Sequence, residues 1–191
     1  MPITLENISK NFENKSVIKE LSYTFPEKGV VAVTGMSGVG KTTLIRIILG
    51  LDRADSGKIT GNNAKFSVVF QENRLVPTLT AIENILFTTD EPKSKDNIIK
   101  ATELLKAVGL KGEENTLPKE LSGGMARRVA IARALCVDGI LVLDEPFKEI
   151  DEQNRMKIIP LIKTRSEKDL VILVTHNEND ITDLDAIELK L

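Results

Sequence analysis

Cysteine and histidine are nearly absent from this sequence of 191 residues, which contains one of each. A single cysteine, Cys136, excludes a disulfide framework within the chain and is typical of proteins from a reducing compartment. We expect Cys136 to act as a small buried hydrophobic residue. The only histidine is His176, and a lone histidine more often has a structural role than a functional one.

Strong net charge and long apolar runs are also missing. The formal net charge is −2 and the pI is about 5.6, so no general basic surface for nucleic acid is expected. Apolar runs such as 44–51, which Arg46 interrupts, are shorter than the roughly 18 residues that span a bilayer. The first ten residues, MPITLENISK, contain no signal-peptide core. We therefore expect a soluble cytoplasmic protein without direct membrane insertion and without a nucleic-acid partner.

Apolar strands alternate with helical segments, which predicts an α/β fold with a mainly parallel sheet. The two N-terminal strands are expected to pair antiparallel through a turn at 11–15. Strands are expected at 3–8, 17–25, 30–33, 58–60, 66–70, 140–143, 170–174 and 186–191. We predict one domain over 1–191, with 1–71 and 139–191 as the catalytic core and 72–138 as an inserted helical subdomain.

Several helix boundaries follow from local chemistry. Thr80 and Glu83 have the spacing of a capping box, and Asp151 is a typical N-cap. Gly109 is expected to end a helix that precedes it. Pro160 falls inside the helix that Asp151 begins, and we expect it to kink or split that helix.

The stretch 30–50, VVAVTGMSGVGKTTLIRIILG, places a glycine-rich loop between an apolar strand and an apolar helix. It matches the phosphate-binding pattern GxxxxGK[ST] at every fixed position, although an incidental glycine-rich turn is the alternative. Backbone N–H groups and the helix N-terminus favour phosphate here, Lys41 adds a cationic donor, and the Thr42 hydroxyl can bind Mg²⁺. We expect a nucleoside triphosphate to be bound by Gly35, Met36, Ser37, Gly38, Val39, Gly40, Lys41, Thr42 and Thr43.

Two adjacent carboxylates follow the apolar strand at 140–143. Asp144 is placed to hold the Mg²⁺ shell, commonly through water. Glu145 is placed to polarise an attacking water as a general base. Adjacent acids also occur in surface turns, so this assignment depends on the nucleotide loop upstream.

A second anion-binding feature is LSGGM at 121–125. Ser122, Gly123 and Gly124 stand at the start of an expected helix, where a hydroxyl and backbone N–H groups can bind an anion. The alternative is an ordinary helix start with a flexible glycine pair. One active site does not need two such termini from one chain.

Taken together and in order, these motifs resemble the nucleotide-binding subunit of an ABC transporter over nearly the whole chain. LSGGM is similar to the family signature LSGGQ, and ILVLDEP resembles the second nucleotide motif. The segments VFQENRL and LSGGMARRVAIARAL look most like ATPase subunits of bacterial importers of the nitrate, sulfonate and taurine group.

The resemblance implies roles for three further residues. Phe12 stands where the family usually stacks an aromatic ring on adenine, although a core phenylalanine is the alternative. Gln71 resembles the Q-loop glutamine, which can reach Mg²⁺ or the attacking water. His176 resembles the switch histidine that senses the γ-phosphate. For 147–151, the D-loop of the family, Asp151 could serve only as a helix cap.

The resemblance also implies ATP and Mg²⁺ as cofactors, and an ATPase that powers solute import. Two copies would form a head-to-tail dimer, and a transmembrane permease would hold them at the inner face of the cell membrane. Met125 in place of the signature glutamine, and Lys148, Glu149 and Ile150 in place of small D-loop residues, depart from the family. A soluble ABC-type ATPase without a permease and a P-loop kinase remain as alternatives.

Overall fold

The computed structural model describes residues 2–12 and 15–191 and contains two separate β-sheets. The smaller sheet has the order β2-β1-β4 and is antiparallel. Its strands are β1 (Thr4–Phe12), β2 (Lys15–Thr24) and β4 (Ser56–Thr60). The antiparallel N-terminal pair is thus confirmed. The range expected as a turn, 11–15, overlaps both strands, because β1 runs through Phe12 and β2 begins at Lys15; positions 13–14 lie outside the described residues.

The larger sheet has five parallel strands in the order β5-β6-β7-β3-β8. Its strands are β3 (Gly29–Thr34), β5 (Phe66–Val69), β6 (Ile140–Asp144), β7 (Leu170–Val174) and β8 (Ile187–Lys190). The predicted closing strand at 186–191 is the edge strand β8. Because all five strands are parallel, their carboxyl ends meet at one edge, where open α/β sheets usually bind ligands.

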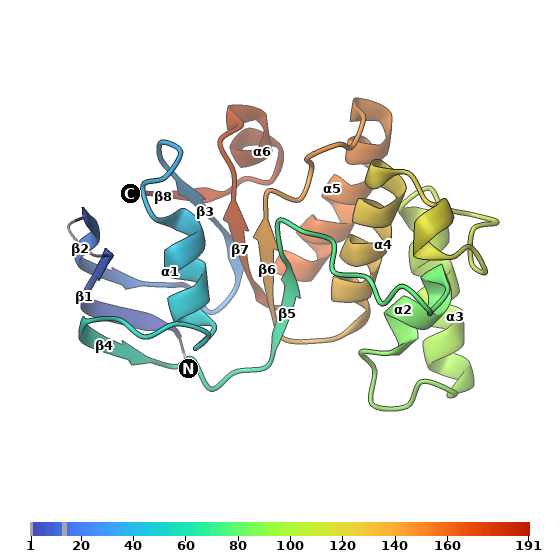
Figure 1. Ribbon diagram of the computed structural model, residues 1–191, viewed down its shortest axis with the longest axis horizontal. Helices are drawn as coiled ribbons and strands as arrows, with labels where there is room; N and C mark the ends of the chain where they lie inside the picture. Colours follow the sequence, from blue (N-terminus) through green and yellow to red (C-terminus); the bar gives the residue numbers. More distant parts are fainter. Residues whose placement is uncertain (1, 13–14) are drawn as a thin grey trace.

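The helices lie on both sides of the parallel sheet (Figure 1). They are α1 (Lys41–Ile48), α2 (Ala81–Leu86), α3 (Lys95–Ala107), α4 (Gly123–Cys136), α5 (Glu152–Ser166) and α6 (Glu178–Asp183), with a 3₁₀ turn at Pro118–Glu120. In Figure 1, α1 lies on the side of the three-stranded sheet, and α2, α3 and α4 lie together on the opposite side.

Alternating side chains of the central strands divide the core into two clusters. Val31 and Val33 face α1 and the antiparallel sheet, whereas Val30 and Ala32 belong to the cluster that includes α4 and α5. Side chains of successive strand residues point to opposite faces, so each strand is apolar throughout when both faces are covered. This explains why the central strands read as continuous apolar runs.

Local sequence signals set most of the helix starts. Thr80 and Glu83 form the predicted capping box on α2, and Asp151 caps α5 through the Asn154 N–H at 2.9 Å. The expectation that Pro160 would split α5 is wrong, since the helix continues through it. Pro160 and Met156 lie on the exposed face of α5, where water can satisfy the carbonyl that loses its N–H partner.

Candidate functional site: a cleft at the carboxyl ends of the parallel strands

The glycine-rich loop joins the end of β3 to the start of α1. The helix begins at Lys41 with Gly40 as its N-cap, so its first N–H groups point into the loop. The Lys41 ammonium donates to the carbonyl oxygens of Gly35 at 2.8 Å and Met36 at 3.0 Å. The ammonium therefore lies inside the curve of the loop, where phosphate is expected.

Gly40 is required by two independent features of its position. Its φ of 115° lies in a region that side chains disfavour, and an added Cβ would lie 2.5 Å from Cγ1 of Val17 on β2. Gly50, just beyond the end of α1, has a φ of 69° but open space around it. Substitutions at the two positions therefore distinguish the effect of backbone strain, which both share, from the effect of crowding, which only Gly40 has.

Gly40→Ala is expected to lower stability more than Gly50→Ala and, unlike it, to weaken ATP binding. The backbone strain of Gly50→Ala amounts to about 1–2 kcal/mol. Gly40→Ala adds crowding against Val17 worth about 1–3 kcal/mol more. Urea unfolding and titration with a fluorescent ATP analogue measure both effects. If both variants lost the same free energy of unfolding, the result would contradict the crowding against Val17.

A cleft of 280 Å³ opens in front of this loop. It is lined by residues of β1, β2, the loop, α1 and three strand ends: Phe12, Val17, Ser37, Gly38, Gly40, Lys41, Thr42, Thr43, Gln71, Asp144, Glu145 and Val174. Thus Phe12 and Gln71 lie in one cleft with the phosphate-binding residues. Phe12 is 49% exposed, which excludes the alternative that it is a core residue.

Thr42 and Asp144 bring a hydroxyl and a carboxylate together at the base of the cleft. The Thr42 hydroxyl donates to Oδ2 of Asp144 at 3.3 Å. Burial raises the pKa of the Asp144 carboxyl, and the hydrogen bond from Thr42 opposes this rise. Within 2–12 and 15–191, no three His, Cys, Asp or Glu side chains gather into a metal site. The pair fits Mg²⁺, which typically takes one or two protein oxygens and completes its shell with water and phosphate oxygens.

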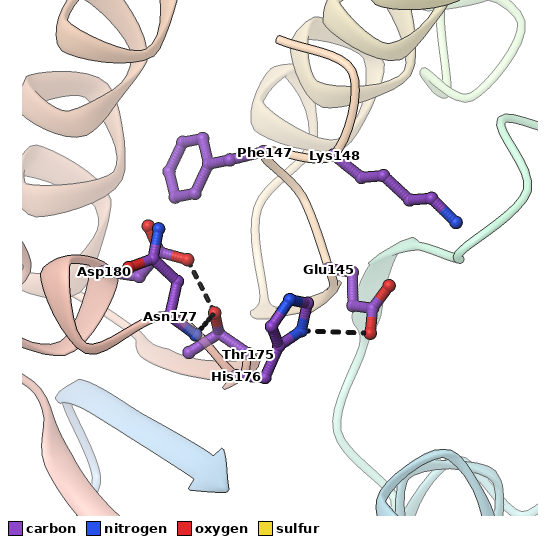
Figure 2. Close-up of a pocket in the computed structure, with 7 residues that line it drawn as sticks. All are labelled: Glu145, Phe147, Lys148, Thr175, His176, Asn177 and Asp180. Carbon is purple, nitrogen blue, oxygen red and sulfur yellow. Dashed lines mark hydrogen bonds and ion pairs between the residues drawn. The ribbon is translucent and has the colours of Figure 1, made fainter. Parts of the chain in front are cut away.

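Glu145 and His176 face each other in a second cavity of 340 Å³ beside the cleft (Figure 2). Nδ1 of His176 lies 3.5 Å from Oε1 of Glu145. Glu145 lines both cavities, so it borders the phosphate-binding cleft as well as the cavity that contains the histidine. Lys148, one of the departures from the family pattern, also lines the second cavity.

The turn that carries His176 is held by a buried network (Figure 2). The Thr175 hydroxyl donates to Asp180 at 2.6 Å and accepts the N–H of Asn177 at 3.1 Å. Asp180, on α6, in turn accepts from Nε of Arg155 at 3.1 Å and from its terminal nitrogen at 3.0 Å. Sequence reasoning missed α6 and this network. Asn177, which caps α6, was the available signal.

Asp180→Ala is expected to lower the free energy of unfolding by about 1–3 kcal/mol, because Thr175 and Arg155 lose a buried acceptor while Arg155 keeps its ion pairs with Asp183 and Glu152. Asp90→Ala serves as the control, since Asp90 forms an exposed ion pair with Lys65 and its loss should cost less than about 1 kcal/mol. Urea unfolding measures both variants. If Asp180→Ala lowered the free energy of unfolding as little as the control does, the result would contradict a stabilising role of the network.

The structure does not bring Ser122, Gly123 and Gly124 to the cleft, since none of the three lines either cavity. They form the start of α4, where Ser122 is the N-cap and its hydroxyl accepts the Met125 N–H at 3.2 Å. Ser122 and Gly123 are exposed. The backbone of Glu149 packs against Gly124 so closely that a Cβ there would clash with the Glu149 carbonyl oxygen.

Comparisons with known proteins identify the family of the chain. The chain matches the ABC transporter family over residues 18–148. An aliphatic sulfonates import ATP-binding protein of Pseudomonas savastanoi pv. phaseolicola is 38% identical over 186 residues, covering 94% of this chain and 77% of the relative. An Fe(3+) ions import ATP-binding protein of Brucella melitensis biotype 1 is 35% identical over 193 residues, covering 93% of this chain and 55% of the relative.

Among solved structures, the ATP-binding cassette MJ0796 in a dimeric post-hydrolysis state, bound to ADP and Pi, superimposes with a TM-score of 0.84. It is 30% identical and the match covers 98% of this chain and 94% of that one. A second dimeric structure of the same cassette has a TM-score of 0.85. The chain therefore belongs to the ABC transporter family and is one of its ATP-binding, ATP-hydrolysing subunits.

Proposed function

We propose that this chain powers solute import by hydrolysing ATP in a dimer docked on a transmembrane permease. The observation that carries the proposal is the position of Glu145 between the phosphate-binding cleft and His176, 3.5 Å from the latter. A general base and a polar partner at the phosphate end of the cleft are what hydrolysis of the outer phosphate requires.

Most of the polar residues that line the cleft and the second cavity have a role in this proposal. Phe12 stacks on the adenine, and the loop from Gly35 with Lys41 and Thr43 holds the phosphates. Thr42, Asp144 and Gln71 would hold Mg²⁺, which would supply neutralisation of charge on the outer phosphates. His176 orients Glu145 and contacts the γ-phosphate. Glu145 polarises the attacking water.

In this proposal, a second copy of the chain supplies the residues that contact the bound ATP from the side opposite the phosphate-binding loop. Ser122, Gly123 and Gly124 start a 14-residue helix that stands outside both cavities, and Ser122 and Gly123 are exposed. A head-to-tail dimer would present this helix end to the γ-phosphate bound by the partner. The dimeric state of the related cassette structures supports such an arrangement.

The predicted helical subdomain, 72–138, carries a groove suited to a permease. The groove of 390 Å³ lies along α2 and α3, and five of its seven lining residues are apolar: Leu79, Leu86, Phe87, Pro92 and Ile98, with Glu83 and Lys93 as the charged ones. Phe87 is 65% exposed, which is unusual for so large an apolar side chain. In the described chain no helix is both long and apolar enough to cross a membrane. The names of the import relatives support a permease partner and a position on the inner face of the membrane.

Incubation of the purified chain with Mg²⁺ and γ-labelled ATP tests this proposal. Free inorganic phosphate is the expected product, released faster when the permease is present. Transfer of the label to an acceptor would instead indicate a P-loop kinase. Hydrolysis that a co-expressed permease neither binds nor stimulates would favour a soluble ABC-type ATPase.

A further inference from the structure

Arg127, in the first half of α4, is one of the most completely buried charged residues in the described chain, with 2% of its surface exposed. Its Nε donates to the carbonyl oxygen of Pro146 at 3.2 Å. One terminal nitrogen donates to the carbonyls of Phe70 and Gln71, the latter at 3.2 Å, and to Oδ1 of Asn73 at 3.3 Å. The other donates to the carbonyls of Asp144 and Glu145, the latter at 2.7 Å.

These acceptors come from two strand ends that carry the chemistry of the cleft. Phe70 and Gln71 follow β5, while Asp144, Glu145 and Pro146 form the end of β6 and the turn after it. A buried carbonyl without a donor costs about 1–3 kcal/mol, so strand ends that leave the sheet need partners of this kind. Only a guanidinium offers five N–H groups in a planar fork, which suits a set of carbonyls spread over two segments.

The contact with Glu145 matters most, because the backbone of this residue is strained. Its φ is 48°, which is uncommon for a residue other than glycine and persists only where the surroundings hold it. The Glu145 N–H donates to the carbonyl of Val174 at 2.9 Å, and the Glu145 carbonyl accepts from Arg127. The residue is thus held on both sides, which fixes the direction of its side chain toward His176.

We propose that Arg127 is a positioning residue that holds the peptides of Gln71 and Glu145 in the geometry needed for hydrolysis. This inference rests on the proposed function of the cleft. Because Arg127 lies five residues after Ser122 on the same helix, it also links the anion-binding start of α4 to the two catalytic strand ends.

The experiment compares R127M with R165M. Arg165 is also a buried arginine that donates to backbone carbonyls, those of Val137 and Gly139, each at 2.7 Å. These carbonyls precede β6, so the two arginines hold opposite ends of one strand. R165M thus reproduces the loss of a buried guanidinium without touching the catalytic end.

For R127M we expect kcat to fall about 10- to 100-fold, as for a small misplacement of a catalytic group. The KM for ATP and the stoichiometry of a bound fluorescent ATP analogue should stay close to the wild-type values. R165M should lose stability while its kcat per bound nucleotide is unchanged. A merely structural role of Arg127 would instead lower the binding stoichiometry in proportion to the rate.

R127K provides a second measurement if R127M does not fold. Lysine keeps the charge but has three donors on one nitrogen, so we expect a kcat between those of R127M and the wild type at full binding stoichiometry. A wild-type kcat in folded R127M or R127K would overturn the proposal. Absence of hydrolysis in the wild-type chain would instead overturn the proposed function itself.

Discussion

Replacing Glu145 by glutamine is expected to lower kcat for ATP hydrolysis by about 10²–10⁴-fold while ATP binding is retained. Glutamine has nearly the same shape as glutamate but cannot accept a proton from water at neutral pH. The phosphate-binding contacts of Lys41 do not involve Glu145, and the backbone hydrogen bonds of Glu145 to Val174 and Arg127 are unaffected by the substitution. The variant should therefore bind ATP without hydrolysing it.

Phosphate release, binding of a fluorescent ATP analogue and size-exclusion chromatography measure this outcome. With ATP present, the variant should accumulate as a dimer, since the step that reopens the proposed dimer is blocked. Glu178→Gln is the matched control, because Glu178 is an exposed carboxylate two residues after His176 that lines neither cavity. Wild-type turnover in Glu145→Gln would rule out Glu145 as the base.

The sequence predicted those parts of the site whose functional residues lie together in one short segment. Thr42 and Lys41 follow from one loop pattern, and Asp144 and Glu145 from the end of one apolar strand. The structure places all four in one cleft because β3, β7 and β6 are neighbours in a parallel sheet. Strand order is not encoded in any single segment, so this proximity could be expected only from the family resemblance.

The fold was predictable to a similar extent. The apolar runs predicted the parallel strands, and Thr80 with Glu83 predicted the start of α2. The separation of the antiparallel strands into a sheet of their own could not be predicted, since it depends on how α1 packs between the two sheets. The short helix α6 was missed because six residues are too few for a periodic pattern.

The hydrogen-bond partners of Arg127 could not be predicted from any sequence pattern. Five of its six acceptors are backbone carbonyls, which every residue possesses, and they lie 17 to 57 positions away in the chain. No residue type at those positions marks them as partners of an arginine. From the sequence alone, Arg127 is one of two adjacent basic residues on a helix next to the signature motif.

The other large effect concerns the number of chains in one site. If Lys41 of one chain and Ser122 of another hold the same ATP, the hydrolysis rate per chain depends on dimerisation. At concentrations far below the dimer dissociation constant, tenfold dilution should lower the rate per chain about tenfold. A rate per chain that stays constant in a monomeric sample would contradict a shared site.

Mixing two inactive variants then tests whether the shared site is head to tail. Lys41→Ala removes the cationic grip on phosphate. Ser122→Asp keeps an oxygen that can cap α4 but places a negative charge where the γ-phosphate should bind. Each variant alone is expected to be inactive, because every dimer of one kind contains two damaged sites.

In an equimolar mixture, half of the dimers contain one chain of each kind. One of their two sites then combines the intact Lys41 of one chain with the intact Ser122 of the other. About a quarter of the wild-type sites should therefore be restored, since a two-fold dimer repeats the same contact twice. If Ser122 served the nucleotide of its own chain, every site would lack one of the two groups and mixing would restore nothing. Recovery of this rate would show that α4 of one chain completes the cleft of the other.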